Sequence, residues 1–170
     1  MDCLCSYGCA RLLPILEQVP TEWLTHKRFF GFSDATVLHT WLNRRGIISF
    51  HSPMPATGLF ANGTRLSQAA LRSALLEETL AKACPSLSSS ILQEGQNASA
   101  AEQTTTREEI SAGRLVGGNL STLAALVGSG CEPFYQNAVL ALEDVGEAPY
   151  RIDRMLTSLS LSLRRKRELT

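Results

Sequence analysis

Hydrophobic and polar positions in the first third of the chain change from the period of a strand to that of a helix and back. Residues 28–32 form an aromatic-rich apolar run, typical of a buried strand. From residue 34 to about 43, apolar residues recur every three or four positions, which predicts a helix. Residues 47–51 form a second short apolar run. Strand, helix and strand joined by short connections predict a right-handed crossover between parallel strands.

The rest of the chain continues with predicted helices and strands, apart from one stretch. Residues 84–106 are rich in serine and threonine, have no hydrophobic period and are interpreted as a linker. The expected domains are therefore 1–84 and 107–170, with a linker over 85–106. The further predicted elements are a helix over 8–17 interrupted at Pro14, a helix over 66–82, a strand over 110–116, a turn over 117–119, a helix over 120–127, a strand over 138–142 and a helix over 150–163.

Composition excludes several classes of partner. The 170 residues carry sixteen basic and sixteen acidic side chains, so no net charge favours nucleic acid or an anionic membrane. Apolar runs fall far short of the roughly 20 residues that span a bilayer, and no basic segment followed by an apolar one opens the chain. We therefore expect a cytoplasmic protein that binds neither membranes nor nucleic acid. The five cysteines lack the spacing of a zinc site, so no metal is expected.

The segment Gly31-Phe32-Ser33 lies between the first predicted strand and its helix. A serine on such a turn can be a nucleophile, with its hydroxyl raised above the sheet edge and the next backbone N–H, that of Asp34, forming half of an oxyanion hole. Such a donor typically contributes about 3–4 kcal/mol to transition-state stabilisation. The alternative is that Ser33 only caps the helix.

A carboxylate and a histidine would have to accompany this serine. Glu143 follows a predicted strand and is either the acid of a triad or a cap or salt-bridge partner. His39 lies about 240° around the helix from Ser33 and should point away. The crossover could bring His51 near Ser33, although a polar residue at a strand end needs no catalytic role. Asn119 follows two glycines and is explained as a helix cap without function.

Four blocks of the chain resemble one family. They are 7–14 (YGCARLLP), 31–38 (GFSDATVL), 117–120 (GGNL) and 142–156 (LEDVGEAPYRIDRML). In this order they are similar to the LD-carboxypeptidases, or muramoyltetrapeptide carboxypeptidases, serine peptidases whose family includes those that give immunity to microcin C. The resemblance implies an α/β fold, with part of a flavodoxin-like parallel-sheet N-terminal domain and part of a C-terminal α/β domain containing a swivelling β-barrel.

The resemblance also implies an activity and a set of site residues. Ser33 matches the nucleophile and Glu143 the acid of a Ser–His–Glu triad. The second oxyanion donor would come from the segment around Gly8, and Asn119 would line the substrate cleft. The implied reaction releases D-alanine from murein tetrapeptide in cell-wall recycling, without a metal or cofactor, in a protein that can be a homodimer. The alternative substrate is a microcin-type peptide-nucleotide.

The chain departs from the family pattern in ways that bear on activity. Ser6 stands where the family has a glycine, and the match fades after Leu156. The family's first strands precede the first block, and its catalytic histidine follows the last one in a Gly-His segment that this sequence does not contain. The sequence is therefore expected to be truncated at both ends, and a non-catalytic remnant is the alternative to an active peptidase.

Overall fold

The computed structural model describes residues 8–53, 63–76 and 113–168. The chain falls into two compact units, one formed by Met1–Gly63 with Ala112–Thr170 and the other by Thr64–Ser111. The first unit contains all the strands of the described part, in two parallel pairs. The predicted α/β fold class is therefore confirmed.

The first described segment is helical. A 3-10 helix, η1 (Cys9–Leu12), leads directly into α1 (Leu13–Leu16), and a second 3-10 helix, η2 (Thr21–Trp23), follows. Pro14 lies in the first turn of α1. A backbone N–H in the first turn of a helix has no intrahelical acceptor, so proline, which lacks this N–H, loses no hydrogen bond there. The predicted interruption at Pro14 is therefore wrong: the change from 3-10 to α geometry comes one residue earlier.

The predicted crossover is present. Strands β1 (Phe29–Gly31) and β2 (Ser49–His51) are parallel and hydrogen-bonded. Between them lie the 3-10 turn η3 (Ser33–Ala35) and helix α2 (Thr36–Arg44). The rings of Phe30 and Phe50, which are register partners, stack with centroids 4.8 Å apart. Ser33 and His51 consequently both lie at the C-terminal edge of this strand pair.

A second strand–helix–strand arrangement follows in the same unit. Strands β3 (Arg114–Asn119) and β4 (Ala138–Glu143) are parallel, with α6 (Leu120–Ala125) between them, and α7 (Pro149–Glu168) comes last. Asn119 and Glu143 are register partners at the C-terminal end of the pair.

The turn predicted at residues 117–119 is wrong, because these residues extend β3. Gly117 and Gly118 have φ of +141° and +136°, values that side chains rarely allow. A Cβ on Gly117 would lie 1.8 Å from the carbonyl oxygen of Ala141, and one on Gly118 would lie 2.6 Å from Thr36 Oγ1. The two glycines therefore allow β3 to approach both β4 and α2.

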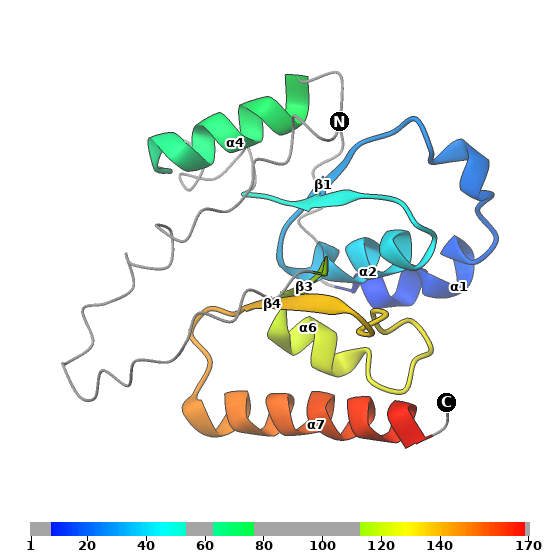
Figure 1. Cartoon of the computed structure of the whole chain (residues 1–170), viewed down its shortest axis with the longest axis vertical. Helices are drawn as coiled ribbons and strands as arrows, with labels where there is room; N and C mark the ends of the chain where they lie inside the picture. The colour runs from blue at the N-terminus through cyan, green and yellow to red at the C-terminus, as the bar shows by residue number, and fades with distance from the viewer. Residues whose placement is uncertain (1–7, 54–62, 77–112, 169–170) are drawn as a thin grey trace. The chain divides into compact units, whose positions relative to one another are not determined.

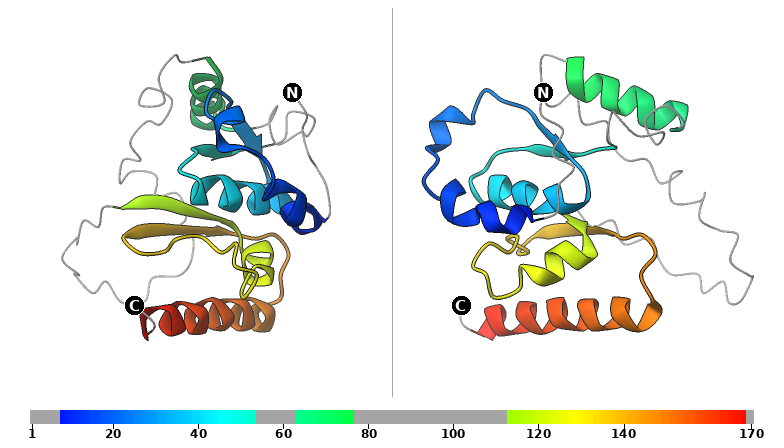
Figure 2. Two further views of the ribbon diagram at one scale, coloured as in Figure 1. Left: turned by 90° about the vertical axis from the view of Figure 1, so that its right-hand side faces the viewer. Right: turned by 180° about the vertical axis from the view of Figure 1, so that it is seen from behind.

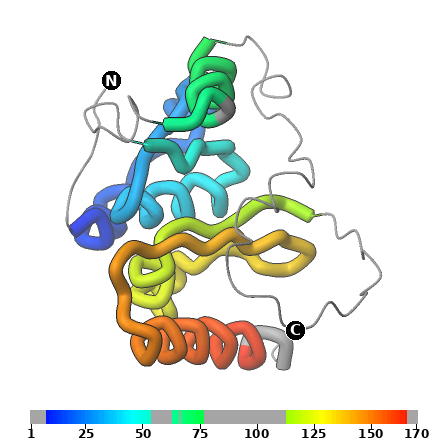
Figure 3. The backbone as a smooth tube through the Cα atoms, turned by 90° about the vertical axis from the view of Figure 1, so that its left-hand side faces the viewer, coloured from blue at the N-terminus to red at the C-terminus, as the bar shows by residue number. Residues whose placement is uncertain are grey.

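Helix α2 lies between the two strand pairs of this unit, with α6 and then α7 beyond β3 and β4 (Figure 1). The views from the side and from behind show the same order (Figure 2), and the tube follows β3 into α6 and β4 into α7 (Figure 3). Three clusters of buried side chains hold these layers. Their buried members are Leu24, Trp41, Leu42 and Cys131; Cys9, Val37 and Leu126; and Leu120, Leu123 and Leu159.

The other unit is described only over residues 64–76. Helix α4 (Arg65–Leu76) agrees with the start of the helix predicted over 66–82, and Thr64 Oγ1 accepts the Ser67 N–H at 3.1 Å as a cap. The remainder of that helix and the linker predicted over 85–106 lie outside the described residues. Over the ranges that are described, no helix is long and apolar enough to cross a bilayer.

Candidate active site

Ser33 lies on a strained turn at the end of β1. Its φ is +54°, and in the described part of the chain only Asn137 shares a positive φ among residues other than glycine. This conformation costs a residue with a side chain roughly 1–2 kcal/mol. The turn is closed by the Ala35 N–H, which donates to the Phe32 carbonyl at 3.1 Å. Ser33 is an exposed residue, and strained residues of this kind are often found at functional sites.

Close packing of β1 against the following turn depends on Gly31. A Cβ on Gly31 would lie 2.5 Å from the Cβ of Ala35, which is itself 3 % exposed. A second glycine is common at the position of Ala35 in such turns, and here alanine fits because Gly31 leaves room for it. The geometry around Ser33 is therefore that of a sharp strand-to-helix turn.

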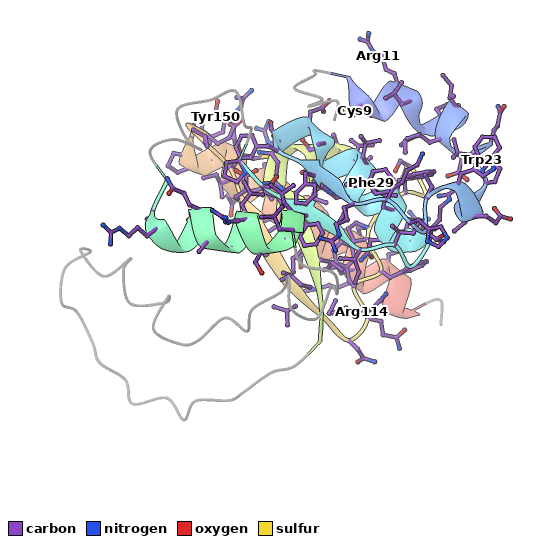
Figure 4. The ribbon with its side chains drawn as sticks, turned by 90° about the horizontal axis from the view of Figure 1, so that it is seen from above. Cys9, Arg11, Trp23, Phe29, Arg114 and Tyr150 are labelled. Atoms are coloured by element: carbon purple, nitrogen blue, oxygen red, sulfur yellow. The ribbon has the colours of Figure 1, made fainter. Side chains whose placement is uncertain are left out.

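Asp34 joins this turn to the start of η1. Its Oδ2 accepts the backbone N–H of Cys9 at 2.7 Å, and Cys9 is buried against Val37 and Leu126. Gly8, with φ of +103°, precedes this bond directly. Arg11, which belongs to η1, projects away from the ribbon (Figure 4). The Asp34 side chain thus holds the Gly8–Cys9 backbone next to the serine turn.

A pocket of about 410 Å³ opens beside Ser33. We call it the serine pocket. It brings together four of the residues that the sequence singled out, namely Ser33, Asp34, Asn119 and Glu143. They come from the ends of β1, β3 and β4, which are far apart in the chain. Gly8 is not among the lining residues, although Ala10 of η1 is.

Asn119 is held as a helix cap at the wall of this pocket. Its Oδ1 accepts the Thr122 N–H at 3.1 Å and the hydroxyls of Ser121 and Thr122 at 2.7 and 2.9 Å. Asp144 also binds the N-terminus of α6, where its Oδ2 accepts the Ser121 N–H at 3.0 Å. Asn119 and Asp144 thus provide hydrogen-bond acceptors for backbone N–H groups in the first turn of α6. Glu143 takes no part in this cap.

Glu143 faces a histidine that sequence reasoning did not pair with it. Glu143 Oε1 lies 3.6 Å from Nε2 of His51, and each side chain is 32 % exposed. Burial lowers the pKa of His51 below its ordinary 6.5, although the Glu143 carboxylate acts in the opposite direction. His51 is therefore neutral at pH 7, and the contact joins a carboxylate to an uncharged imidazole. The contact between Glu143 and His51 depends on the registers of the two strand pairs, which the sequence alone does not give.

His39 lies behind His51, with ring centroids 5.8 Å apart. Its Nδ1 shares a 2.8 Å hydrogen bond with Ser49 Oγ, and burial lowers its pKa to about 4. Neither histidine lines the serine pocket, and neither does His26. The ring of His51 instead lies against Phe32, with centroids 5.5 Å apart. In the described residues, no group of three or more His, Cys, Asp or Glu side chains could hold a metal ion.

Comparisons with known proteins place both ends of the chain in one family. Residues 3–52 match the sequence model of the LD-carboxypeptidase N-terminal domain, and residues 112–167 match that of the LD-carboxypeptidase C-terminal domain. The chain is 34 % identical over 136 residues to a protein of Bacillus subtilis named a probable murein peptide carboxypeptidase, covering 79 % of this chain and 39 % of the relative. It is 32 % identical over 159 residues to the murein tetrapeptide carboxypeptidase of Pseudomonas aeruginosa, covering 93 % and 49 %.

A solved structure is similar as well. The crystal structure of a muramoyltetrapeptide carboxypeptidase from Oxalobacter formigenes superposes with a TM-score of 0.61 at 26 % identity, over 92 % of this chain and 48 % of that one. The chain thus spans less than half the length of each of these three proteins.

Proposed function

Since this chain belongs to the LD-carboxypeptidase family, we propose that it carries the nucleophile and the acid of a serine-type carboxypeptidase. The substrate is a murein tetrapeptide, from which the enzyme releases the terminal D-alanine during cell-wall recycling. The observation that carries the proposal is Ser33, held exposed at φ +54° in a pocket that Glu143 also lines. A strained residue at such a place is characteristic of functional sites.

In this mechanism Ser33 Oγ attacks the carbonyl carbon of the LD peptide bond and forms a tetrahedral intermediate. The backbone N–H of Asp34 donates to the developing oxyanion, and the Gly8 segment, held near by the Asp34–Cys9 bond, supplies the second donor. The acyl-enzyme forms when D-alanine leaves with a proton from the general acid, and water then hydrolyses the ester. No metal or cofactor takes part.

The base is a histidine whose imidazole Glu143 orients. None of the three histidines of this sequence lines the serine pocket, so we assign the base to the family's Gly-His segment outside these residues. The two matched domains support the proposed division into 1–84 and 107–170, joined by 85–106. Within the family, the microcin-type peptide-nucleotides are the alternative substrate class.

A second candidate function is substrate binding without hydrolysis. It is favoured by the absence of any histidine from the lining of the serine pocket. Loss of the base of a serine triad lowers kcat by about 10⁴- to 10⁶-fold. A chain in that condition would keep the pocket and lose the turnover.

One experiment separates the two candidates. A longer chain, which continues these 170 residues into the family's Gly-His segment, is incubated with murein tetrapeptide, released D-alanine is quantified, and binding is measured by calorimetry. The peptidase proposal expects release that Ser33→Ala abolishes and Ser160→Ala, on an exposed position of α7, does not change. Binding without release indicates the second candidate. A chain that neither binds the tetrapeptide nor releases D-alanine contradicts both.

A further inference from the structure

The two oxygens of the Glu143 carboxylate have different surroundings. Oε1 is buried, has no hydrogen bond among the described residues and lies 3.6 Å from Nε2 of His51. The side chain as a whole is 32 % exposed, so its exposed surface belongs to its other atoms. Glu143 also lines the serine pocket, which His51 does not. One oxygen of the carboxylate is therefore directed at His51, and Oε2 is available to a second partner.

The ring of His51 is held in place by its neighbours. As the last residue of β2, His51 is the register partner of Gly31 in β1. Its ring lies against that of Phe32, with centroids 5.5 Å apart, and against that of the buried His39, with centroids 5.8 Å apart. A side chain confined in this way loses little further conformational entropy when it holds a partner. The fold thus directs Nε2 of His51 at Glu143.

The charge state of His51 suits a hydrogen-bond donor rather than an ion-pair partner. Two titratable side chains face its ring, Glu143 from β4 and His39 from α2. Burial lowers the pKa of His51 below 6.5 by more than the Glu143 carboxylate raises it, so the imidazole is neutral at pH 7 and keeps one N–H. A neutral donor fixes a carboxylate without cancelling its negative charge. The acid of a serine triad needs that charge to stabilise the imidazolium of the base.

The separation of 3.6 Å between His51 Nε2 and Glu143 Oε1 is longer than a formed N–H···O bond, which spans about 2.7–3.2 Å. Hydrogen bonds of catalytic sites often shorten to that length only when the substrate is bound. Among the described residues, His51 is the one side chain in polar contact with the Glu143 carboxylate. It is therefore the group that can fix the carboxylate.

From these observations we infer that His51 is a positioning residue for the carboxylate of Glu143. Its Nε2–H donates to Oε1, which holds the carboxylate in one orientation and directs Oε2 to the imidazole of the catalytic base. His51 is not itself the base, because it does not line the serine pocket and its Nε2 is directed at the carboxylate. The inference rests on the proposed function, in which Glu143 orients that base.

The first test concerns the contact alone and uses the 170-residue chain with ¹⁵N-labelled histidine. The ¹⁵N chemical shifts of His51 at pH 7.5 should be those of the Nε2–H tautomer. In Glu143→Gln, loss of the negative charge should lower the pKa of His51 further. Asp153→Asn, which removes an exposed carboxylate on α7, is the matched control and should leave that pKa unchanged. An Nδ1–H tautomer, or a His51 pKa that Glu143→Gln does not change, overturns the inference.

The second test measures D-alanine release by the longer chain that continues into the Gly-His segment. His51→Leu removes the donor and should lower kcat by about 10- to 100-fold with KM unchanged, as expected for the loss of one hydrogen bond to a charged group. His51→Gln places an amide N–H near the position of Nε2 and should restore most of kcat. His26→Leu, at an exposed histidine, is the matched control and should release D-alanine as the parent does.

The outcomes separate this inference from the proposed function. A parent chain that releases no D-alanine contradicts the proposed function, and the inference with it. If the parent is active, an unchanged kcat in His51→Leu overturns the inference alone, and so does a His51→Gln variant as slow as His51→Leu. A loss of about 10⁴-fold or more in both variants would make His51 the base and would also overturn it. If His51→Leu does not fold, His51→Ala takes its place in the comparison with His51→Gln.

Discussion

The backbone N–H of Asn119 donates to Thr36 Oγ1 at 2.9 Å. This bond joins the last residue of β3 to the first residue of α2, across 83 positions of the chain. Thr36 is fully buried and Asn119 is 7 % exposed. Ser33 precedes Thr36 by one turn and Glu143 is the register partner of Asn119, so this bond helps to place the two walls of the serine pocket.

Replacing Thr36 by valine should therefore destabilise the protein. The variant keeps the shape of the side chain but leaves the buried N–H of Asn119 without an acceptor, which costs about 1–3 kcal/mol. Urea unfolding followed by circular dichroism measures the loss. Thr36→Ser retains the hydroxyl and should lose less, and Thr157→Val, at an exposed position of α7, should change little. A Thr36→Val variant as stable as Thr157→Val would show that this bond contributes nothing.

Gly117→Ala should disrupt the second strand pair. A Cβ there would lie 1.8 Å from the Ala141 carbonyl oxygen, at a φ of +141°. Gly46→Ala is a matched control, because Gly46 also has a positive φ of +73° but open space around it. The control should cost only the backbone strain, about 1–2 kcal/mol. We expect Gly117→Ala to cost clearly more, measured as the difference in unfolding midpoint between the two variants. Similar midpoints would refute the close approach of β3 and β4.

Relief of strain at Ser33 should stabilise the chain. Ser33→Gly removes a side chain from φ +54°, worth roughly 1–2 kcal/mol, and adds backbone entropy to the unfolded state, worth about 0.5–1 kcal/mol. The expected net gain is about 0.5–1 kcal/mol, read from thermal unfolding. Asn137→Gly is the control, since asparagine tolerates the same conformation better than serine. A destabilised Ser33→Gly would mean that the serine hydroxyl contributes more than the strain costs.

The stability of the protein should fall as the pH is lowered from about 6.5 toward 4. His39 has a pKa of about 4 when folded and about 6.5 when unfolded, so in this window the unfolded chain binds a proton that the folded chain does not. The contribution of His39 to the free energy of unfolding is complete above pH 6.5. Its loss on acidification amounts to at most about 3 kcal/mol. The lowered pKa of His51 acts in the same direction.

Urea midpoints at several pH values would test this expectation. Most of the decline between pH 6.5 and 4.5 should disappear in His39→Gln, which keeps a group able to bond with Ser49. His26, which is exposed, provides the control: His26→Gln should keep the full decline. An identical pH dependence in the parent and in His39→Gln would show that His39 titrates normally.

Much of the local structure follows from nearby residues. The elements around Ser33 were predictable because the apolar run of β1, the glycine at its end and the helical period after it are local patterns. The parallel pairing of β1 with β2 also followed, since short connections through one helix leave few topologies. The turn predicted at Gly117 and Gly118 failed because two glycines signal a turn in isolation, whereas here they permit a strand to pack closely on its neighbours.

The sequence by itself determined most of the elements, the presence of a turn at Ser33 and the family to which the chain belongs, because these depend on neighbours in the chain and on motifs of adjacent residues. The tertiary structure alone decided that Ser33 and Glu143 line one pocket and that His51 faces Glu143. Those contacts depend on the registers of two strand pairs and on how they pack about α2. Such distances are set by buried packing between segments remote in sequence, which no local pattern encodes.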